Sequence, residues 1–174
     1  MMHFIKHKII VAFVVSLLCG VTTIFACDCP RISMESAVKN SSIILSGKIL
    51  GFEYRKGIPD QRRDSSAAEM DEQIDYETLV VRVQVEQWWK GNAPTEIFLI
   101  TDILKFADGT SRRSSCDYNF LSGESYLIFA AGKENEYRTS ECSRTRKLTL
   151  AKDDLKILGE GKKPIKSEDE PTNS

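Results

Sequence analysis

Histidine is nearly absent from this sequence. The two histidines, His3 and His7, both stand at the extreme N-terminus, just ahead of an apolar stretch. If this terminus is removed on export, the rest of the chain has no imidazole. That excludes Ser-His and Cys-His nucleophile pairs and every metal site that requires a histidine ligand. The remaining acidic and basic groups form no recognisable catalytic pattern, so we do not expect an enzyme or a cofactor of its own.

The sequence also lacks a hydrophobic run long enough for a confident membrane span, which takes about 20 apolar residues. No charge of one sign dominates either. The formal net charge is −1, and it becomes −3 when Lys6 and Lys8 are removed with the N-terminus. Without a strong basic field, nucleic acid is not an expected partner.

The first 26 residues have the pattern of a secretory signal peptide. Lys6 and Lys8 precede the apolar run 9–18, and Ala26 provides a small residue for cleavage. We therefore predict a secreted protein, extracellular or periplasmic, that begins at Cys27. An uncleaved N-terminal anchor and a lipid anchor on Cys27 are the alternatives, although the bulky Phe25 fits lipoprotein processing poorly.

Four cysteines remain after cleavage, and an even number in an exported chain predicts two disulfides. Pairing Cys27 with Cys29 would close a very tight ring, which disfavours it. Both other connectivities join this N-terminal pair to Cys116 and Cys142. Each bridge would close a loop of about 90–115 residues, worth roughly 4–5 kcal/mol in the chain-entropy model. A soft-metal or redox site is the less favoured interpretation of Cys-x-Cys.

The pattern along the chain is mostly β. The strand 78–88 shows the clearest period of two, with Leu79, Val81, Val83 and Val85 on one face. Gly47 indicates a bulge or strong coiling in the first strand. The expected elements are a helix at 34–40 with Ser33 as its N-cap, strands at 43–52, 78–88, 96–101 and 125–131, a fifth strand at 137–139, and a helix at 150–158 with Leu155 and Leu158 facing inward.

Two segments are poor in apolar residues. Residues 54–75 are charged and contain turn residues, so we expect a long mobile loop or a splayed hairpin tip. Residues 160–174 are charged and contain proline, which predicts a disordered tail. The folded domain is therefore expected at 27–159. Its coiled strands and interspersed helices predict a small closed Greek-key barrel of the OB-fold type with one or two flanking helices, with a β-sandwich as the alternative.

A set of short motifs then resembles a known family. Cys27-Asp28-Cys29-Pro30 directly after the signal is similar to the mature N-terminus of the tissue inhibitors of metalloproteinases, members of the netrin-like domain superfamily. The motifs that follow in the expected order are Ser46-Gly47-Lys48-Ile49, Trp89-Lys90-Gly91, Cys116-Asp117-Tyr118-Asn119-Phe120, Gly123-Glu124-Ser125-Tyr126-Leu127-Ile128 and Cys142-Ser143-Arg144-Thr145, the last as in bacterial members.

The resemblance covers about 27–158 and implies an OB-fold barrel with disulfides Cys27–Cys116 and Cys29–Cys142. It also implies that Cys27, Asp28 and Cys29 contact the zinc site of a target metalloprotease, where Cys27 would ligate the zinc of the target. Two features depart from the animal inhibitors. The third disulfide and the C-terminal subdomain are absent, and Asp28 stands where a side chain must enter the S1′ pocket of the protease. Burying an unpaired carboxylate there is costly, so the inference of inhibition is weaker than that of fold.

The resemblance supplies one functional hypothesis, and its rival belongs to another class. In the first, the Cys27 amine and carbonyl chelate the catalytic zinc of a protease in the position that water otherwise occupies. In the second, the barrel is an extracellular or envelope interaction module without inhibitory activity, and its surface or the 54–76 loop binds a protein or glycan.

The other conspicuous polar and aromatic pairs are interpreted structurally. We expect one of Trp88 and Trp89 to face the core rather than to stack on a ligand. Arg112-Arg113 with the serines that follow is interpreted as a solvated loop. Asp153-Asp154 is interpreted as first-turn helix charge rather than a metal pair.

Overall fold

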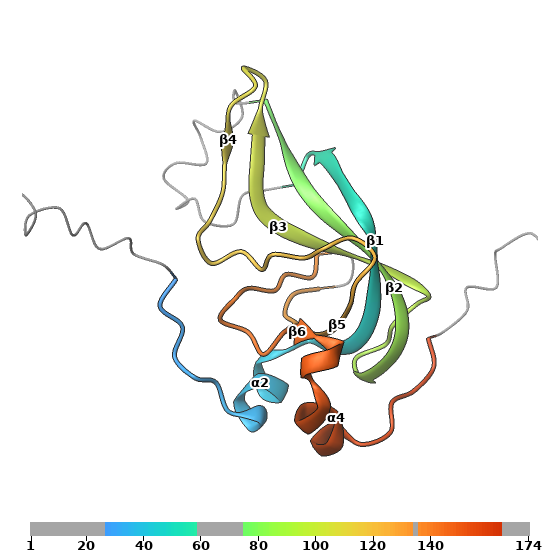
Figure 1. Ribbon diagram of the computed structural model, residues 1–174. Helices are drawn as coiled ribbons and strands as arrows, with labels where there is room; N and C mark the ends of the chain where they lie inside the picture. The colour runs from blue at the N-terminus through green and yellow to red at the C-terminus, as the bar shows by residue number, and fades with distance from the viewer. Residues whose placement is uncertain (1–26, 59–74, 134–135, 165–174) are drawn as a thin grey trace, which may run out of the picture.

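The strands of this protein form one curled sheet. The computed structural model describes residues 27–58, 75–133 and 136–164, so the expected signal peptide at 1–26 lies outside the described residues. Six antiparallel strands follow the order β4-β3-β2-β1-β5-β6. Their bounds are β1 Ile43–Lys56, β2 Tyr76–Lys90, β3 Glu96–Phe106, β4 Ser111–Arg112, β5 Ser125–Ala130 and β6 Arg146–Lys147. The sheet curls strongly into a half-barrel, with two short helices at one end (Figure 1). The mainly-β class with flanking helices is confirmed, and the strands form one sheet rather than the two of a sandwich.

Helix α2 (Met34–Asn40) matches its predicted bounds. The side chain of Ser33 accepts a hydrogen bond from the Ser36 amide at 3.1 Å, which satisfies one of the amides that a helix leaves unpaired at its start. The second helix, α4 (Lys152–Leu158), is shorter than expected because a 3₁₀ turn, η1 (Leu148–Leu150), precedes it. Leu155 and Leu158 pack inward as predicted.

The central strands are longer than the sequence pattern indicated. β1 continues to Lys56, so the first residues of the expected 54–75 loop belong to this strand. β2 begins at Tyr76, directly after that loop, and the ends of the two strands pair as a ribbon. Apolar alternation stops earlier than the hydrogen bonding because charged side chains cover the exposed ribbon. The Lys56 ammonium and the Asp75 carboxylate pair at 2.9 Å across its neck. The rest of the expected loop, 59–74, lies outside the described residues.

Three other strand boundaries also moved. β2 continues past Trp88, where the expected strand ended, through Trp89 to Lys90, and β3 extends beyond residue 101 to Phe106. The expected strand at 137–139 is reduced to isolated bridges. The Ile100 amide donates to the Tyr137 carbonyl at 2.8 Å, while Ala131 and Arg138 exchange backbone hydrogen bonds. Tyr137 and Arg138 therefore link β3 to the end of β5.

Bulges give β1 and β2 their curvature. The predicted bulge at Gly47 is confirmed by a register shift between Ser46 and Gly47. A second shift lies between Thr78 and Val80. Val80 is buried and Leu79 is only half-buried, whereas strict alternation predicted the reverse. Val81, Val83 and Val85 face the core as expected.

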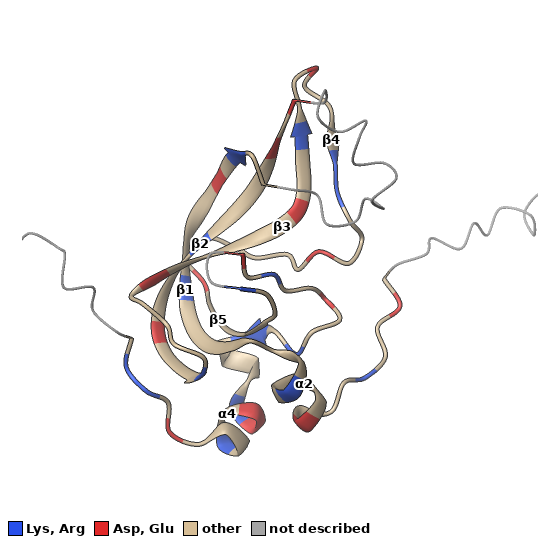
Figure 2. Cartoon of the chain, turned by 180° about the vertical axis from the view of Figure 1, so that it is seen from behind, with Lys and Arg blue, Asp and Glu red and all other residues tan. Residues whose placement is uncertain are grey.

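Apolar side chains form two clusters, one on each side of β1 and β5. The inner cluster fills the curl of the sheet with residues such as Leu45, Val83 and Tyr126. In the outer cluster, Ile44, Leu127 and Phe129 pack against the two helices. Alternate residues of β1 thus serve different clusters, which fixes both helices against the outside of the half-barrel. Lysine, arginine and acidic residues are interspersed along the strands rather than gathered by sign (Figure 2).

The segment after α4 is ordered where we expected a disordered tail to begin. Trp88 and Lys162 exchange backbone hydrogen bonds at 2.8 and 2.9 Å. The indole N–H of Trp88 donates to the Lys163 carbonyl, and that of Trp89 to the Gly159 carbonyl, each at 2.9 Å. Two tryptophans therefore hold residues 159–163 against β2. Residues 165–174 lie outside the described residues.

Candidate functional site

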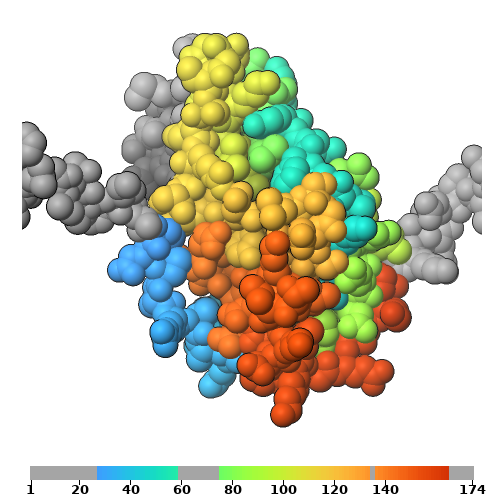
Figure 3. Space-filling model, in the orientation of Figure 1, coloured from blue at the N-terminus to red at the C-terminus, as the bar shows by residue number. Residues whose placement is uncertain are grey.

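Two disulfides attach the first described residues to the body of the domain. Cys27 is bonded to Cys116 and Cys29 to Cys142, with Cα–Cα distances of 5.0 and 4.8 Å. This confirms the pairing that the family resemblance implied. Cys116 lies between β4 and β5, and Cys142 lies between β5 and β6. The N-terminal residues run over the surface beside both segments (Figure 3).

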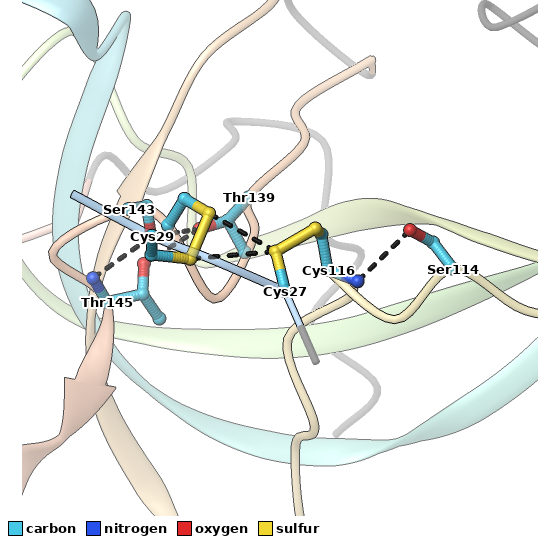
Figure 4. Close-up of a disulfide and its surroundings, with 8 residues drawn as sticks. Cys27, Cys29, Ser114, Cys116, Thr139, Ser143 and Thr145 are labelled. Atoms are coloured by element: carbon cyan, nitrogen blue, oxygen red, sulfur yellow. Dashed lines mark hydrogen bonds between the residues drawn. A yellow bond between two sulfur atoms is a disulfide. The ribbon is translucent and has the colours of Figure 1, made fainter. Parts of the chain in front are cut away.

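The two bridges touch each other. The Sγ atom of Cys27 lies 3.3 Å from that of Cys142 and 3.6 Å from that of Cys29 (Figure 4). Since sulfurs in disulfides carry no proton, these are packing contacts. Residues 27–29 are thus attached at both ends of a three-residue segment, which leaves its backbone little freedom.

The two receiving segments, 114–119 and 139–145, also bind each other; together we call them the platform. The Glu141 amide donates to the Cys116 carbonyl at 2.9 Å, and Asp117 forms an antiparallel bridge with Ser140. The buried Ser114 hydroxyl accepts from the Cys116 amide at 3.1 Å (Figure 4). We had interpreted Ser114 as part of a solvated loop; it instead forms part of the platform.

Hydroxyl groups fasten the platform to β5. Thr139 donates to the Phe129 carbonyl at 2.9 Å, and its hydroxyl lies 2.9 Å from that of Ser143. The Phe129 amide donates to the Thr145 hydroxyl at 2.9 Å. The side chains of Thr139, Ser143 and Thr145 lie next to the Cys29–Cys142 bridge (Figure 4), so hydrogen bonds hold the segment around this bridge against β5.

Arg144 provides a third attachment for the N-terminal segment, one that sequence reasoning missed. Its guanidinium donates to the Ile32 carbonyl at 2.8 Å and, through Nε and Nη2, to Asp154 at 3.0 and 2.8 Å. Asp154 is 1% exposed and also pairs with Arg146 at 3.3 Å. Asp154 does lie in the first turn of α4, but it is a buried anchor and not a solvated helix charge. Arg144 was visible only as part of a motif, because nothing in the local sequence pairs it with residues 32 and 154.

The exposed part of this segment is its middle residue. Asp28 is exposed, whereas Cys27 and Cys29 are half-buried. The structure therefore brings together all three predicted contact residues and turns the Asp28 side chain to solvent. A rigid backbone with one projecting side chain can enter a cleft without a large ordering cost.

The chain matches no model of a known protein family and no curated protein.

The cysteine sulfurs are the one group of potential metal ligands that lie close together among the described residues. The Sγ atoms of Cys27, Cys116 and Cys142 lie within 4.8 Å of one another. Metal binding by cysteine requires the thiolate, and all three sulfurs are bonded in disulfides. These disulfides indicate an oxidising setting, extracellular or periplasmic. None of the described helices is long and apolar enough to cross a membrane.

Tyr118 follows the first platform cysteine closely and packs its ring against Phe120 and Tyr126, with centroids 4.7 and 5.8 Å away. Burial, aided by the negative charge of Glu141, raises the pKa of Tyr118 to about 12. The phenol is consequently neutral at physiological pH and contributes packing rather than charge next to the site.

The tryptophan pair and the arginine pair considered in the sequence analysis lie outside this site. Trp88 is buried in the inner cluster and Trp89 packs on the outer one, and both are covered by residues 159–163. Arg112 is an exposed residue of β4, and Arg113 donates to the Asn119 amide oxygen at 3.2 Å.

Proposed function

We propose that this protein is exported, cleaved after Ala26, and inhibits a zinc metalloprotease through the new N-terminus at Cys27. The observation that carries the proposal is the double tether: disulfides at Cys27 and Cys29 end on one platform and hold the segment rigidly with Asp28 exposed. An inhibitor gains affinity when its binding segment is ordered in advance.

The chemistry requires a free amine. After cleavage, the Cys27 amine and carbonyl could bind the protease zinc as a five-membered chelate ring in the position that a catalytic zinc leaves for water. An ordinary N-terminal amine has a pKa of about 8, so an unprotonated fraction is present at neutral pH. The disulfide side chain of Cys27 would fix the direction of both ligand atoms.

The proposal extends to the fold, which we take to be a closed barrel of the OB-fold type. In support, Tyr137 pairs with Leu99 of β3 and Arg138 pairs with Ala131 at the end of β5. These bridges join elements on opposite sides of the sheet order, as closure of the half-barrel requires.

Enzyme assays with the mature, oxidised protein test the proposal. A single extra residue before Cys27, or carbamylation of its amine, should abolish inhibition because the ligand atom is lost. Far-ultraviolet circular dichroism should not change, since neither the disulfides nor the sheet needs the amine.

A substitution at Asp28 provides an independent test of the proposed inhibition. Asp28→Thr removes a charge that the protease pocket must desolvate, so it should strengthen inhibition by about 5- to 150-fold, or 1–3 kcal/mol. Asp153→Thr, an exposed aspartate on α4, is the matched control and should leave inhibition unchanged. If neither the wild type nor Asp28→Thr inhibits any of a broad panel of metalloproteases at micromolar concentration, the proposal is wrong.

That outcome with an intact fold would favour the second candidate, an extracellular or envelope interaction module. The observation that supports it is an exposed apolar row on β1. Leu50, Phe52 and Tyr54 are 41%, 44% and 42% exposed, at alternate positions of one strand. Exposed apolar groups in such a row are typical of a protein contact surface.

A further inference from the structure

A pocket lies beside the Cys29–Cys142 bridge, and Cys142 forms part of its lining. Its volume is about 340 Å³, and residues of α2, β5 and the platform line it. The cavity contains two arginines, Arg138 and Arg144, and the hydroxyl residues Ser140 and Ser143, whereas its apolar wall includes Ala37 and Phe129.

Both arginines are held in place before any ligand arrives. Arg138 donates to the Asp102 carboxylate at 2.9 Å and to the Thr101 carbonyl at 3.3 Å. Arg144 is fixed by Asp154 and by the Ile32 carbonyl. A guanidinium that is already ordered loses little entropy when it binds an anion.

Not every N–H group of the Arg144 guanidinium is used by these hydrogen bonds. A guanidinium carries five N–H groups, and the hydrogen bonds to Asp154 and Ile32 use three of those on Arg144. Two N–H groups therefore take no part in these hydrogen bonds. Arg144 lines the cavity and its side chain is 22% exposed, so the residue is not fully enclosed by protein.

The charge of the cavity sets the charge of its ligand. Two guanidinium groups face one lining carboxylate, that of Asp102. Behind Arg144, the negative charge of Asp154 is shared with Arg146, so that trio retains one positive charge. The lining is thus complementary to a single negative charge rather than to a dianion.

We propose that this cavity binds a carboxylate that carries a small apolar group. The planar fork of arginine matches the two oxygens of a carboxylate, and the hydroxyls of Ser140 and Ser143 extend the polar wall. Ala37 and Phe129 would contact the apolar part of the ligand. A free short-chain acid and the C-terminus of a peptide share this chemistry.

Titrations followed by amide NMR shifts of the oxidised protein test the site and separate the two sources. Isovalerate is the free acid, an acetylated dipeptide ending in valine is the peptide, and its C-terminal amide is the uncharged control. We expect shifts at residues 138–144 and 37–41 with isovalerate, the peptide acid or both, and none with the amide. Binding of the peptide acid alone would identify a peptide terminus as the ligand.

Two variants probe the cavity without removing an ion-pair partner. Ser140→Leu should fill it and abolish the shifts, and Arg144→Lys keeps the charge but loses the fork, which should weaken binding by about tenfold. Ser111→Leu on β4 and Arg82→Lys on β2 are the matched controls, and both should bind like the wild type. The proposal is overturned if no carboxylate perturbs these residues in the millimolar range, or if Ser140→Leu binds as well as the wild type while folded.

Discussion

At Gly47 the backbone of β1 lies too close to β2 for any side chain. A Cβ atom there would stand 2.5 Å from Cγ1 of the buried Val83 and 2.7 Å from the Gln84 carbonyl oxygen. The second contact is with backbone, which cannot rotate away. Gly47→Ala should therefore destabilise the protein by about 2–3 kcal/mol, as overpacking in a core does, in urea denaturation experiments.

Gly51 on the same strand provides the control for Gly47. A Cβ atom at Gly51 would meet no atom within 4 Å. Gly51→Ala should leave stability unchanged or raise it by up to about 1 kcal/mol, because alanine reduces the freedom of the unfolded chain. Equal effects of the two substitutions would contradict the close approach of β1 and β2.

At the scale of elements, the sequence predicted which helices and strands form better than it predicted where each of them ends. Helix α2 and the cores of the long strands were found because a capping serine and alternating valines are local signals. The outer ends of β1 and β2 were missed because charged residues such as Glu53, Arg55 and Glu77 leave no apolar period of two there. The order of residues 159–163 was missed for a related reason: their partners are the indole N–H groups of Trp88 and Trp89, about 70 residues away in sequence.

We predict that residues 159–163 contribute to the stability of the protein and shield both tryptophans from water. Ending the chain after Leu158 removes two indole hydrogen bonds and two backbone hydrogen bonds to Trp88. At about 1 kcal/mol for each net hydrogen bond, with some compensation by water, we expect a loss of about 3 kcal/mol. Because the protein has two tryptophans, both in this contact, fluorescence emission should shift to the red as they become hydrated.

Ending the chain after Pro164 is the matched control, since it keeps the hydrogen bonds of residues 159–163 to both tryptophans. Its emission spectrum and stability should equal those of the whole protein. An unshifted spectrum for the chain that ends at Leu158 would mean that the segment does not cover the indoles.

For the molecule as a whole, local sequence and long-range contacts contributed differently to the site. The cysteine order reduced the pairing to few choices, and the motifs selected the one that the structure has. The third attachment could not be predicted, because Arg144, Ile32 and Asp154 meet only after the platform and α4 have packed. The cavity beside the bridge depends on the same packing, so nothing in the sequence indicated that Arg138 and Arg144 would line one cavity.

The two disulfides cross-link the same two regions of the molecule, so their contributions to stability depend on each other. They span 89 and 113 residues in sequence. With one bridge intact, the other closes a ring of only about 28 residues, so the pair Cys29→Ser and Cys142→Ser should cost about 3.5 kcal/mol. Removing both bridges also releases the long loop and should cost about 8 kcal/mol, more than twice as much.

Urea denaturation of the wild type, of each variant lacking one bridge and of the variant with four serines measures this difference. Because small domains are stable by only about 5–15 kcal/mol, the variant with four serines should be largely unfolded in buffer or close to it. Each variant with one bridge should fold and show a lower midpoint. If the four-serine variant folds and loses no more stability than a one-bridge variant, the bridges do not constrain the chain together and the double tether of residues 27–29 would be wrong.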